Sequence, residues 1–507
     1  MSLTLIERFL RGLEISPDRD AVRVGSDLVT YRQAHETALL WAGSLMADGS
    51  HGSVGVLAGK SRAAYVGLLA VLYAGGTVVP LQPSFPAKLT RRMMKMAGVD
   101  KLIADDRGLA VLPEILDEEM TVRVLDTDGL ADNFPTIPVT SDSALSAPVQ
   151  VAADGPAYIL FTSGSTGVPK GVPISHRGFA TYFGELDRRC DFGSNDVFSQ
   201  TFDLNFDLGI HDVFAAWGAG ATLQEVPPSA YRDLPAYVAE HGITVWNSTP
   251  SGIWMTREME GLEKGALNGL RWSFFGGEAL RCQDVEDWLV AAPGSKLDNI
   301  YGPTEFSIGI CWHRWLGEES KKRGVNGTVP IGKVHAGHDF RLVTEQGEQS
   351  SVEGELWVTG PQISTGYLDP AENEGRFVDL DGRRWYRTGD RVRATPDGDL
   401  SYIGRLDSQV KVHAWRIELA EVDHVVSECD GVRDAVTVPK PAEHGTELIV
   451  FYTGDEVPES TLANGVRAVL PYTVLPRRYV HLDEFPLNSN RKVDRLALRK
   501  RAEELRG

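Results

Sequence analysis

Residues 162–171 bring together hydroxyl side chains, glycines and one lysine directly after a short apolar run at residues 157–161. Glycines let backbone N–H groups approach a ligand closely, and the hydroxyls and Lys170 add donors and a positive charge. A buried strand followed by such a loop predicts a phosphate-binding site. The hydroxyl donors are Thr162, Ser163, Ser165 and Thr166, and the glycines are Gly164, Gly167 and Gly171.

Two other interpretations of this loop are weaker. A Walker loop requires Ser or Thr after Gly-Lys, whereas here Pro169 precedes Lys170 and Gly171 follows it. A flexible Gly/Ser turn without a ligand is the default for an isolated loop of this kind. Ten consecutive residues of these types, placed straight after an apolar strand, favour the phosphate-binding interpretation.

Two further places in the chain carry oxygen-bearing side chains beside a turn. Thr304 and Glu305 bring a hydroxyl and a carboxylate to one point, and hard oxygen ligands of this kind suit a magnesium–triphosphate complex. A turn that caps a helix is an equally good interpretation of these two residues alone. Asp390 follows a glycine, and a carboxylate has acceptor capacity for both hydroxyls of a ribose. The alternative for Asp390 is a solvated hairpin turn.

Five motifs resemble, in the same order, those of the adenylate-forming superfamily, which includes amino-acid adenylation domains, acyl-CoA synthetases and luciferases. The resemblance extends over residues 158–494 and implies a ligase that uses ATP and Mg²⁺. The five motifs lie at residues 162–171, 299–305, 385–390, 407–411 and 486–494.

The resemblance implies a nucleotide-binding role for each matching residue. Tyr301 is expected to stack on the adenine and Asn299 to meet its amino group. Thr304 and Glu305 are expected at the phosphates, with Glu305 holding Mg²⁺ through them. The other ATP-binding residues implied are the phosphate-loop residues with Lys170, then Gly277, Glu278, Asp390 and Arg405.

The last two motifs imply a catalytic lysine on a mobile C-terminal domain. Lys492 is expected to stabilise charge that develops on the α-phosphate and the attacking carboxylate, although a solvated basic tail is the alternative. Asp407 and Lys411 match the hinge about which the small domain rotates between adenylation and thiolation. The family usually carries a glycine shortly after the hinge lysine, whereas this chain has Ala414, which limits positive φ. We therefore expect the thiolation-side loop to depart from the family's shape.

Residues 201–214 contain two Phe-Asp pairs, and the resemblance places Asp207 at the position where amino-acid adenylation domains bind the substrate ammonium. A carboxylate buried without a cationic partner is costly, so an ammonium-bearing substrate would compensate it. Helix capping is the alternative, more serious for Asp203 than for Asp207. The substrate pocket implied by the same alignment is lined by Asp207, Leu208, His211, Asn247, Phe274, Gly276, Ile300, Ile308 and Gly309.

Asn247 and His211 are polar and suggest a small substrate side chain with a hydrogen-bonding group, such as that of threonine, serine or cysteine. Alanine, D-alanine, proline and β-amino acids stay open. An acyl-CoA synthetase that activates a plain carboxylic acid is the main alternative, and it would not need Asp207. A regulatory nucleotide-binding protein without turnover is disfavoured by the presence of Lys492, Glu305 and Asp390.

The composition restricts the partners. The formal net charge of −19 over 507 residues repels polyanions, so we expect no nucleic-acid partner. The N-terminus lacks a signal-peptide core, and the most apolar window, residues 63–80, is broken by two glycines. We expect a cytoplasmic protein without membrane contact. No phosphopantetheine site follows Lys492, so the predicted acceptor is a carrier protein acting in trans.

Alternating helical and strand patterns predict an α/β fold. The large N-terminal domain, residues 1–405, is expected to consist of layered α/β subdomains plus a β-rich subdomain after about residue 330. The small, mobile α+β C-terminal domain is expected at residues 406–507. Predicted strands lie at residues 28–31, 53–57, 243–247, 272–275, 354–358, 432–439 and 448–452, and predicted helices at 31–46 and 417–427.

Overall fold

The computed structural model describes residues 3–505 except 48, 50, 128, 130, 132, 163–168, 326, 345, 406–408, 413–414, 443–444, 471–473 and 487–492. At 409, 416, 418, 420, 421, 424 and 496 it describes the backbone alone. The chain forms two compact units. The first comprises Met1–Pro83, Arg91–Phe161 and Gly171–Gly404, and the second comprises Ser84–Thr90, Thr162–Lys170 and Arg405–Gly507. The domain boundary that we place after residue 405 stays a prediction.

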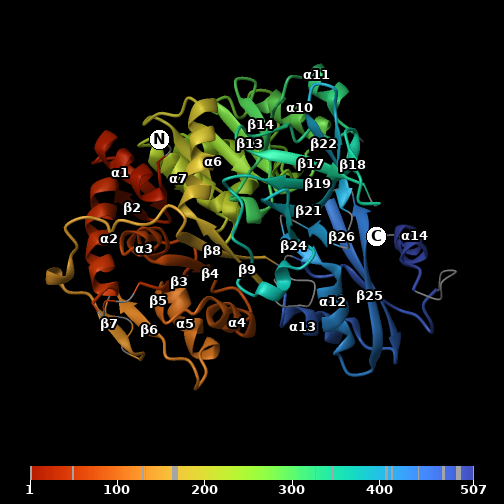
Figure 1. The fold of residues 1–507 in the computed structure, drawn as a ribbon, viewed down its shortest axis with the longest axis horizontal. Helices are drawn as coiled ribbons and strands as arrows, with labels where there is room; N and C mark the ends of the chain where they lie inside the picture. Colours follow the sequence, from red (N-terminus) through yellow and green to blue (C-terminus); the bar gives the residue numbers. More distant parts are fainter. Residues whose placement is uncertain are drawn as a thin grey trace. The chain divides into compact units, whose positions relative to one another are not determined.

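A seven-stranded sheet with the order β7-β6-β5-β3-β4-β8-β9 lies in the N-terminal part of the chain (Figure 1). Its central strand β3 pairs in parallel with β4 and with β5. The short apolar runs of these strands fit a parallel sheet covered on both faces. The strands are β3 (Ser53–Leu57), β4 (Thr77–Leu81), β5 (Lys101–Ala104), β6 (Arg123–Asp126), β7 (Thr136–Pro138), β8 (Pro156–Thr162) and β9 (Lys170–Ser175).

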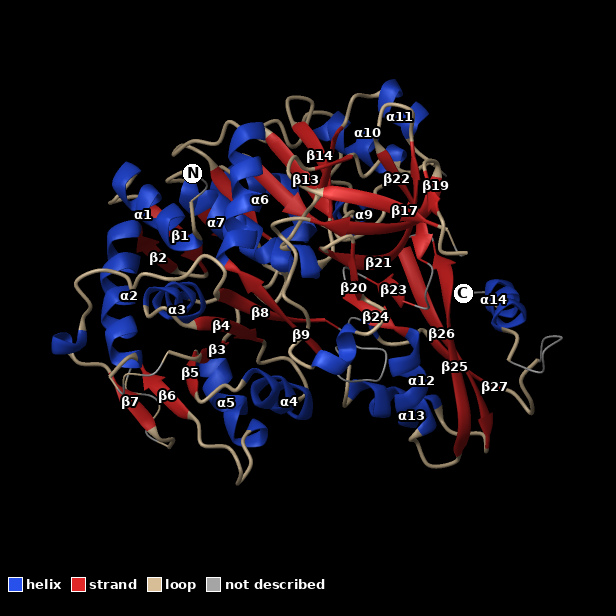
Figure 2. Ribbon diagram, viewed as in Figure 1, coloured by secondary structure: helices blue, strands red, loops and turns tan. Residues whose placement is uncertain are grey.

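Helices cover this sheet. In the view of Figure 2, α3 and α5 lie to either side of β3, β4 and β5. Helix α3 buries every residue after Arg62, as expected of a helix that is apolar all round. Side chains of Thr4 and Thr30 cap α1 and α2 in capping boxes with Glu7 and Gln33, which satisfy N–H groups in the first helical turn. The helices are α1 (Leu5–Ile15), α2 (Tyr31–Leu45), α3 (Arg62–Tyr73), α4 (Ala87–Ala97) and α5 (Asp106–Ile115).

A nine-stranded sheet with the order β16-β15-β14-β13-β12-β10-β11-β1-β2 forms the centre of the first unit. From β1 through β14 along this order, neighbouring strands pair in parallel. In open parallel sheets, ligands bind outside the carboxyl ends of the strands. The strands are β1 (Asp20–Val24), β2 (Asp27–Thr30), β10 (Val197–Gln200), β11 (Thr222–Glu225), β12 (Val245–Ser248), β13 (Trp272–Gly276), β14 (Lys296–Tyr301), β15 (Cys311–Arg314) and β16 (Lys333–Val334).

The helices that follow in the first unit connect the strands of this sheet. Helix α7 is almost entirely buried and packs against α1. Helix α8 ends at Gly242 with φ +64°, the left-handed conformation that glycine adopts most readily. The helices are α6 (His176–Arg189), α7 (Asp207–Gly218), α8 (Leu234–His241), α9 (Ser251–Glu258), α10 (Cys282–Ala291) and α11 (Glu318–Arg323).

The β-rich part that the sequence predicts after residue 330 is a six-stranded sheet. Its order is β18-β17-β19-β21-β20, and β22 also pairs with β21. The pairs along the order are antiparallel, as in β17–β19 and β19–β21. The strands are β17 (Asp339–Val343), β18 (Gln349–Ser350), β19 (Glu353–Thr359), β20 (Phe377–Leu380), β21 (Arg383–Ala394) and β22 (Leu400–Arg405).

The second unit has its own small sheets and core. Strands β23 (Gln409–Val412) and β24 (Trp415–Glu418) form an antiparallel pair. A three-stranded sheet follows, with the order β25-β26-β27, and its buried face includes Leu448 and Val450. The remaining elements are α12 (Leu419–Ser427), β25 (Val432–Ala442), β26 (Gly445–Gly454), α13 (Glu459–Arg467), β27 (Arg478–His481) and α14 (Arg495–Glu504).

The predicted α/β fold class with its β-rich part is confirmed, and most predicted elements agree with the structure to within a few residues. One predicted boundary is wrong. The helix expected over 417–427 begins at Leu419, and Ile417 belongs to β24, where it pairs with Val410. Its side chain is buried in the core of the second unit. Within the described residues, no helix is both long and apolar enough to cross a membrane.

A buried arginine connects α1 to α7. Arg8 Nη1 and Nη2 donate to Asp187 Oδ2 and Oδ1 at 2.8 and 3.1 Å, and Nε donates to the carbonyl of Phe214 at 2.9 Å. Only 1% of the Arg8 side chain is exposed, and burial lowers the pKa of Arg8 from its ordinary value. A Cβ on Gly218 would lie 2.4 Å from the guanidinium, so α7 needs a glycine at this point. Arg8 thus holds the last turns of α7 in place.

We expect Arg8→Met to lower the free energy of unfolding by about 2–4 kcal/mol, because it removes a bidentate ion pair and leaves the Phe214 carbonyl buried without its donor. Chemical denaturation measures this change. Arg11→Ala is the matched control, since Arg11 is half exposed and lies 3.7 Å from the same carboxylate; a surface pair is worth at most about 1 kcal/mol. Equal effects of the two substitutions would contradict the assigned role of Arg8.

Candidate functional site

The carboxyl ends of neighbouring parallel strands carry four of the residues predicted to line a substrate pocket. Asn247 on β12 lies opposite Phe274 on β13, and Gly276 on β13 lies opposite Ile300 on β14. All four are buried. The close approach of β13 and β14 leaves no room for a side chain at residue 276, since a Cβ there would lie 2.9 Å from the Ile300 carbonyl oxygen. The nine-stranded sheet therefore brings these four residues together.

Helix α7 supplies three more predicted pocket residues, Asp207, Leu208 and His211. Asp207 is the first residue of the helix and is half-buried, and Leu208 and His211 are buried. Phe206 is the N-cap, and no side chain caps this helix. As the acidic residue of the first turn, Asp207 is also placed to interact with the positive end of the helix dipole, so both interpretations of this carboxylate stay predictions. Asp203, the acid of the other Phe-Asp pair, lies in the preceding turn, where its backbone carbonyl accepts from Phe206 N.

His211 is held from two sides. Its Nδ1 lies 2.8 Å from Tyr182 Oη, and its ring packs against that of Phe274 with centroids 5.6 Å apart. Burial lowers the pKa of His211 to about 3, so the imidazole is neutral at physiological pH. Tyr182, on α6, is a neighbour that sequence reasoning did not select.

The predicted pocket residues Ile308 and Gly309 lie on a distorted turn. Ser307 and Ile308 have φ of +51° and +80°, a left-handed conformation that is costly for a β-branched residue. Gln362 holds this turn, because its Nε2 donates to the carbonyls of Phe306 and Gly309 at 2.9 and 3.0 Å. Sequence reasoning missed Gln362, which is more than fifty residues away along the chain.

Glycine is required at position 309 by its surroundings. A Cβ there would lie 2.7 Å from Ile300 Cγ2, 3.1 Å from Trp312 Nε1 and 3.3 Å from Tyr182 Cε2. The Cα of Gly309 therefore packs directly against three side chains from β14, β15 and α6. This packing connects the distorted turn to the residues around His211.

A β-bulge directs Asp390 into the interior. The register between β19 and β21 shifts between Glu355 and Trp357, and Gly389 in the bulged strand has φ +70°. Bulges re-aim side chains in this way. Asp390 is 4% exposed, which excludes the solvated hairpin turn considered from the sequence. Tyr301 Oη donates to Asp390 Oδ2 at 2.6 Å, and burial followed by the nearby Asp390 charge raises the pKa of Tyr301 well above its ordinary value.

Glu305 lies on a short 3₁₀ turn, η3 (Thr304–Phe306), which directly precedes the distorted turn. Its side chain is 1% exposed and Oε1 accepts from Tyr367 Oη at 2.6 Å. Its backbone carbonyl accepts from Ser364 N at 2.8 Å. Thr304 is half-buried. No signal in the sequence pointed to Tyr367, which reaches Glu305 only in the folded protein.

The other predicted adenine wall consists of Gly277 and Glu278. Gly277 has φ +85°, so the chain turns sharply where β13 ends. Glu278 Oε2 accepts from Ser251 Oγ at 2.6 Å, which holds the carboxylate against the start of α9. Both residues follow the carboxyl end of a strand in the parallel part of the sheet.

Asn299 has a defined amide orientation. Its Nδ2 donates to the carbonyl of Pro330 at 2.9 Å, with the carbonyl of Val329 at 3.5 Å. This network places the donor end of the amide toward the protein and leaves the acceptor Oδ1 for another group. An amino group of a ligand would satisfy that acceptor.

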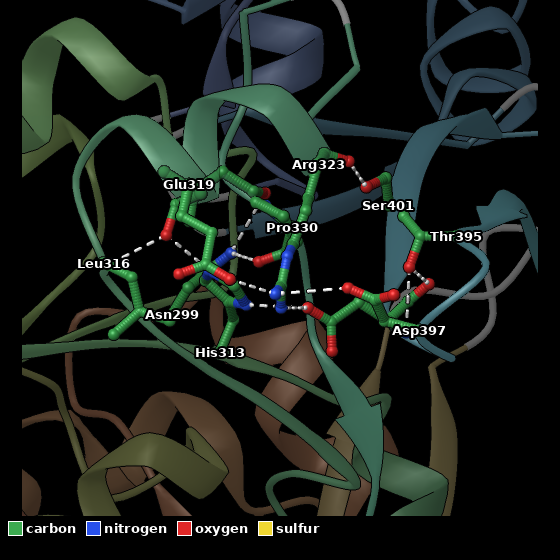
Figure 3. A network of polar contacts seen from close by, with 12 residues as sticks. Asn299, His313, Leu316, Glu319, Arg323, Pro330, Thr395, Asp397 and Ser401 are labelled. Atoms are coloured by element: carbon green, nitrogen blue, oxygen red, sulfur yellow. Dashed lines mark hydrogen bonds and ion pairs between the residues drawn. The ribbon is translucent and has the colours of Figure 1, made fainter.

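Arg323 anchors the segment that returns to Asn299 (Figure 3). Its Nη1 donates to Asp399 Oδ2 at 2.9 Å, Nη2 lies 3.2 Å from Asp397 Oδ2, and its carbonyl accepts from Ser401 Oγ at 2.8 Å. These contacts tie α11 to β22 and to the turn before it. The end of α11 is thereby held close to the six-stranded sheet.

Several predicted site residues lie outside this arrangement. Thr162, Lys170, Arg405 and Lys411 belong to the second unit; Thr162 ends β8, Lys170 begins β9, Arg405 ends β22 and Lys411 lies in β23. Their roles stay predictions. The remaining predicted residues lie outside the described residues: Ser163, Gly164, Ser165, Thr166, Gly167, Asp407 and Lys492, as does Ala414.

The acidic and polar groups at the carboxyl ends of the strands fit a nucleotide better than a metal centre alone. Among the residues that the structure describes, no three or more His, Cys, Asp or Glu side chains are grouped so as to hold a metal ion. Asp390 and Asn299 offer acceptors, and Tyr301 offers an aromatic ring beside them.

Comparison with known proteins gives matches over most or all of the chain. A family model described as AMP-binding enzyme matches residues 9–368. A dimodular nonribosomal peptide synthase from Bacillus subtilis is 30% identical over 514 residues, which cover 97% of this chain and 21% of that protein. The chain thus spans about a fifth of the length of this curated relative.

Two solved structures match the whole chain. The crystal structure of IdnL7 has 52% sequence identity and a TM-score of 0.77, with 99% of each chain covered. The Vibrio cholerae adenylation domain AlmE, solved in complex with glycyl-adenosine-5′-phosphate, has 26% identity and a TM-score of 0.86, with 99% of this chain and 98% of that chain covered.

The buried His211 makes a prediction about pH. Because its pKa in the folded protein is about 3, below the ordinary 6.5, the unfolded chain binds a proton at this histidine first as the pH falls. Its contribution to stability is present above pH 6.5 and is lost between pH 6.5 and 3. His211→Gln should reduce the slope of unfolding free energy against pH in this window by up to about 1.4 kcal/mol per pH unit.

Denaturant titrations at several pH values measure this slope. Replacement of the exposed His51 by Gln is the control, since that side chain stays in contact with water in both states. An identical slope for wild type and His211→Gln would show that His211 takes up its proton equally well in the folded protein.

Proposed function

The chain belongs to the AMP-binding enzyme family, and on that premise we propose that it activates an amino acid with ATP as an aminoacyl-adenylate. It then transfers the aminoacyl group to the phosphopantetheine thiol of a separate carrier protein. The likeness to nonribosomal peptide synthases and to AlmE supports the first step. The identity of the amino acid and of the acceptor belongs to the proposal.

The observation that carries the proposal is the position of Asp207. This acid is the first residue of α7, next to buried residues that line the ends of β12, β13 and β14. A half-buried carboxylate there would bind the α-ammonium of an amino acid by a charge-assisted hydrogen bond. A plain carboxylic acid would gain nothing from it. We therefore assign Asp207 to the ammonium of the substrate.

We assign residues to the adenine and the ribose of ATP from the hydrogen bonds that their side chains can make. Asn299 presents an acceptor that suits the amino group of adenine, and Asp390 presents a carboxylate that suits the two ribose hydroxyls. Tyr301 donates to Asp390 and offers its ring to the base. The wall formed by Gly277 and Glu278 closes the other side of the adenine.

The first reaction brings two anions together, since the substrate carboxylate attacks the α-phosphorus of ATP. We assign the phosphate-loop donors and Lys492 to the neutralisation of that repulsion and to holding the reacting atoms in line. Thr304 and Glu305 orient the phosphates, and Mg²⁺ bound with ATP supplies further charge neutralisation when it is present. Pyrophosphate leaves and the acyl-adenylate remains.

The second reaction requires a thiol to reach the same carboxyl carbon. We propose that residues 406–507 reorient about Asp407 and Lys411 between the two reactions, as hinges in such domains are a few element-terminal residues. This proposal rests on the matching motif alone. An acyl-CoA synthetase would share the first reaction and use coenzyme A in the second.

Asp207→Asn should lower kcat/KM for the amino acid by roughly 100-fold or more in ATP–pyrophosphate exchange, because the ammonium loses its charge partner. Asp203→Asn is the matched control and should have a small effect. The panel consists of the proteinogenic amino acids, D-alanine, β-amino acids and plain carboxylic acids.

Exchange driven by plain carboxylic acids and unaffected by Asp207→Asn would favour the acyl-CoA synthetase. The same preparations, supplied with either a phosphopantetheinylated carrier protein or coenzyme A, distinguish the acceptors by mass spectrometry of the thioester product.

Lys492→Ala should depress adenylation by roughly 100-fold or more while the protein stays folded, because a cation is lost from the developing charge. Lys500→Ala tests the alternative of a solvated basic tail, since Lys500 is an exposed residue of α14. Equal exchange rates in the two variants would remove Lys492 from the mechanism.

A further inference from the structure

Asn247 is fixed at three of its four polar atoms. Its backbone N donates to Ser199 Oγ at 2.9 Å, and its backbone carbonyl accepts from Thr201 Oγ1 at 2.6 Å. Its side-chain Nδ2 donates to Asp212 Oδ1 at 2.7 Å. The residue is 1% exposed. Neither its backbone nor its amide group can turn without breaking a buried hydrogen bond.

The fourth polar atom of Asn247 is an acceptor. In the described part of the chain, Asn247 Oδ1 is buried and has no hydrogen-bond partner. Buried polar atoms in native proteins are nearly always paired with protein, water or ligand, so an exception in a predicted pocket points to a ligand. Because Asp212 occupies the donor end of the amide, the group that approaches Oδ1 must itself be a donor.

Asp212 is buried and contacts the amide of Asn247. Its carboxyl is 1% exposed, and burial raises its pKa well above the ordinary value. Lys60, whose charge favours ionisation of Asp212 from a distance, donates to the carbonyls of Gln200 and Thr201 at 2.8 Å each. Within the described residues, the one hydrogen bond that Asp212 makes through its side chain is that from Asn247. Its function is therefore to orient the amide.

His211, which packs against the residue opposite Asn247, supplies a second buried atom without a hydrogen-bond partner in the described part of the chain. Its ring packs against Phe274, the residue opposite Asn247 on the neighbouring strand. Nδ1 is engaged with Tyr182 Oη, while Nε2 has no partner among the described residues. If Tyr182 donates to Nδ1, Nε2 carries the proton and is a donor. A hydroxyl group can both donate, as Asn247 Oδ1 requires, and accept, as a protonated His211 Nε2 requires, whereas a thiol does both weakly.

We propose that the preferred substrate is a small amino acid with a hydroxyl side chain, of the serine or threonine class, whose hydroxyl donates to Asn247 Oδ1. Asp212 is a positioning residue that holds the Asn247 amide in the orientation this requires. The inference rests on the proposed function and narrows its substrate class.

Wild-type enzyme tests the substrate class with two matched pairs, threonine against valine and serine against alanine. Valine has a methyl group where threonine has its hydroxyl, so these two side chains are nearly equal in size. Alanine has a hydrogen where serine has its hydroxyl. We expect kcat/KM in ATP–pyrophosphate exchange to favour the hydroxyl member by roughly 10- to 100-fold, because its analogue leaves buried polar atoms unpaired. Equal values, or a preference for valine and alanine, would overturn the proposal. A preference for ornithine or lysine would also overturn it, because the proposal commits to a hydroxyl side chain and an ammonium group cannot accept a hydrogen bond.

Two variants test the positioning role of Asp212. Asp212→Asn keeps an acceptor for Asn247 Nδ2 and should retain the hydroxyl preference. Asp212→Leu removes that acceptor and should raise KM for threonine while kcat and KM for valine change little, so that the threonine-to-valine ratio falls toward one. A ratio that survives in Asp212→Leu would show that Asn247 needs no such partner. Thermal unfolding of both variants checks folding, and the wild-type ratios decide the substrate class even where Asp212→Leu does not fold.

The outcomes separate this inference from the proposed function. If no amino acid of the panel supports ATP–pyrophosphate exchange, the proposed function is overturned and this inference with it. Exchange that depends on Asp207 but ignores the hydroxyl would overturn this inference alone.

Discussion

Every polar group buried at the carboxyl ends of β12, β13 and β14 must find a partner in the protein or in a ligand, and this constraint shapes the site. Water cannot reach most of these groups, so each unsatisfied atom costs free energy comparable to a lost hydrogen bond. The protein meets the requirement by pairs formed across distant elements, such as Tyr301 with Asp390 and Tyr367 with Glu305. We infer that two of the atoms left over, Asn247 Oδ1 and His211 Nε2, are where a substrate would complete the pairing.

Two backbone distortions serve the same end. The bulge at Gly389 directs an aspartate inward from a long strand, and the left-handed turn at Ser307 and Ile308 presents the residues that follow η3. Both are held by contacts from elsewhere in the first unit, the turn by the Gln362 amide. Such strain persists only where the surroundings over-determine the conformation. The hydrogen bonds of Arg323 likewise hold the end of α11, which precedes the Pro330 carbonyl that accepts from Asn299.

The sequence was sufficient for the fold class and for most elements of the first unit, because apolar runs and turn residues are local signals. Sequence reasoning was less successful where tertiary contacts determine the secondary structure or the orientation of a side chain. Residue 417 has a helical pattern, but pairing with Val410 makes it a strand. Motifs selected Asn299, Tyr301, Glu305 and Asp390, and the roles of these residues toward a ligand stay predictions. The residues that orient them, Gln362, Tyr367 and Asp212, have no local signal, since their contacts depend on the approach of elements far apart in the chain.

The packing at Gly309 has a consequence for how this pocket changes during evolution. Any side chain at 309 meets Ile300 at 2.7 Å, so a lone substitution there is penalised until a smaller residue stands at 300. Replacements at 309 and 300 are therefore expected to be coupled, so that the order in which they occur matters. Libraries that vary residues 300 and 309 together contain compatible pairs of side chains that substitution of one position at a time does not produce.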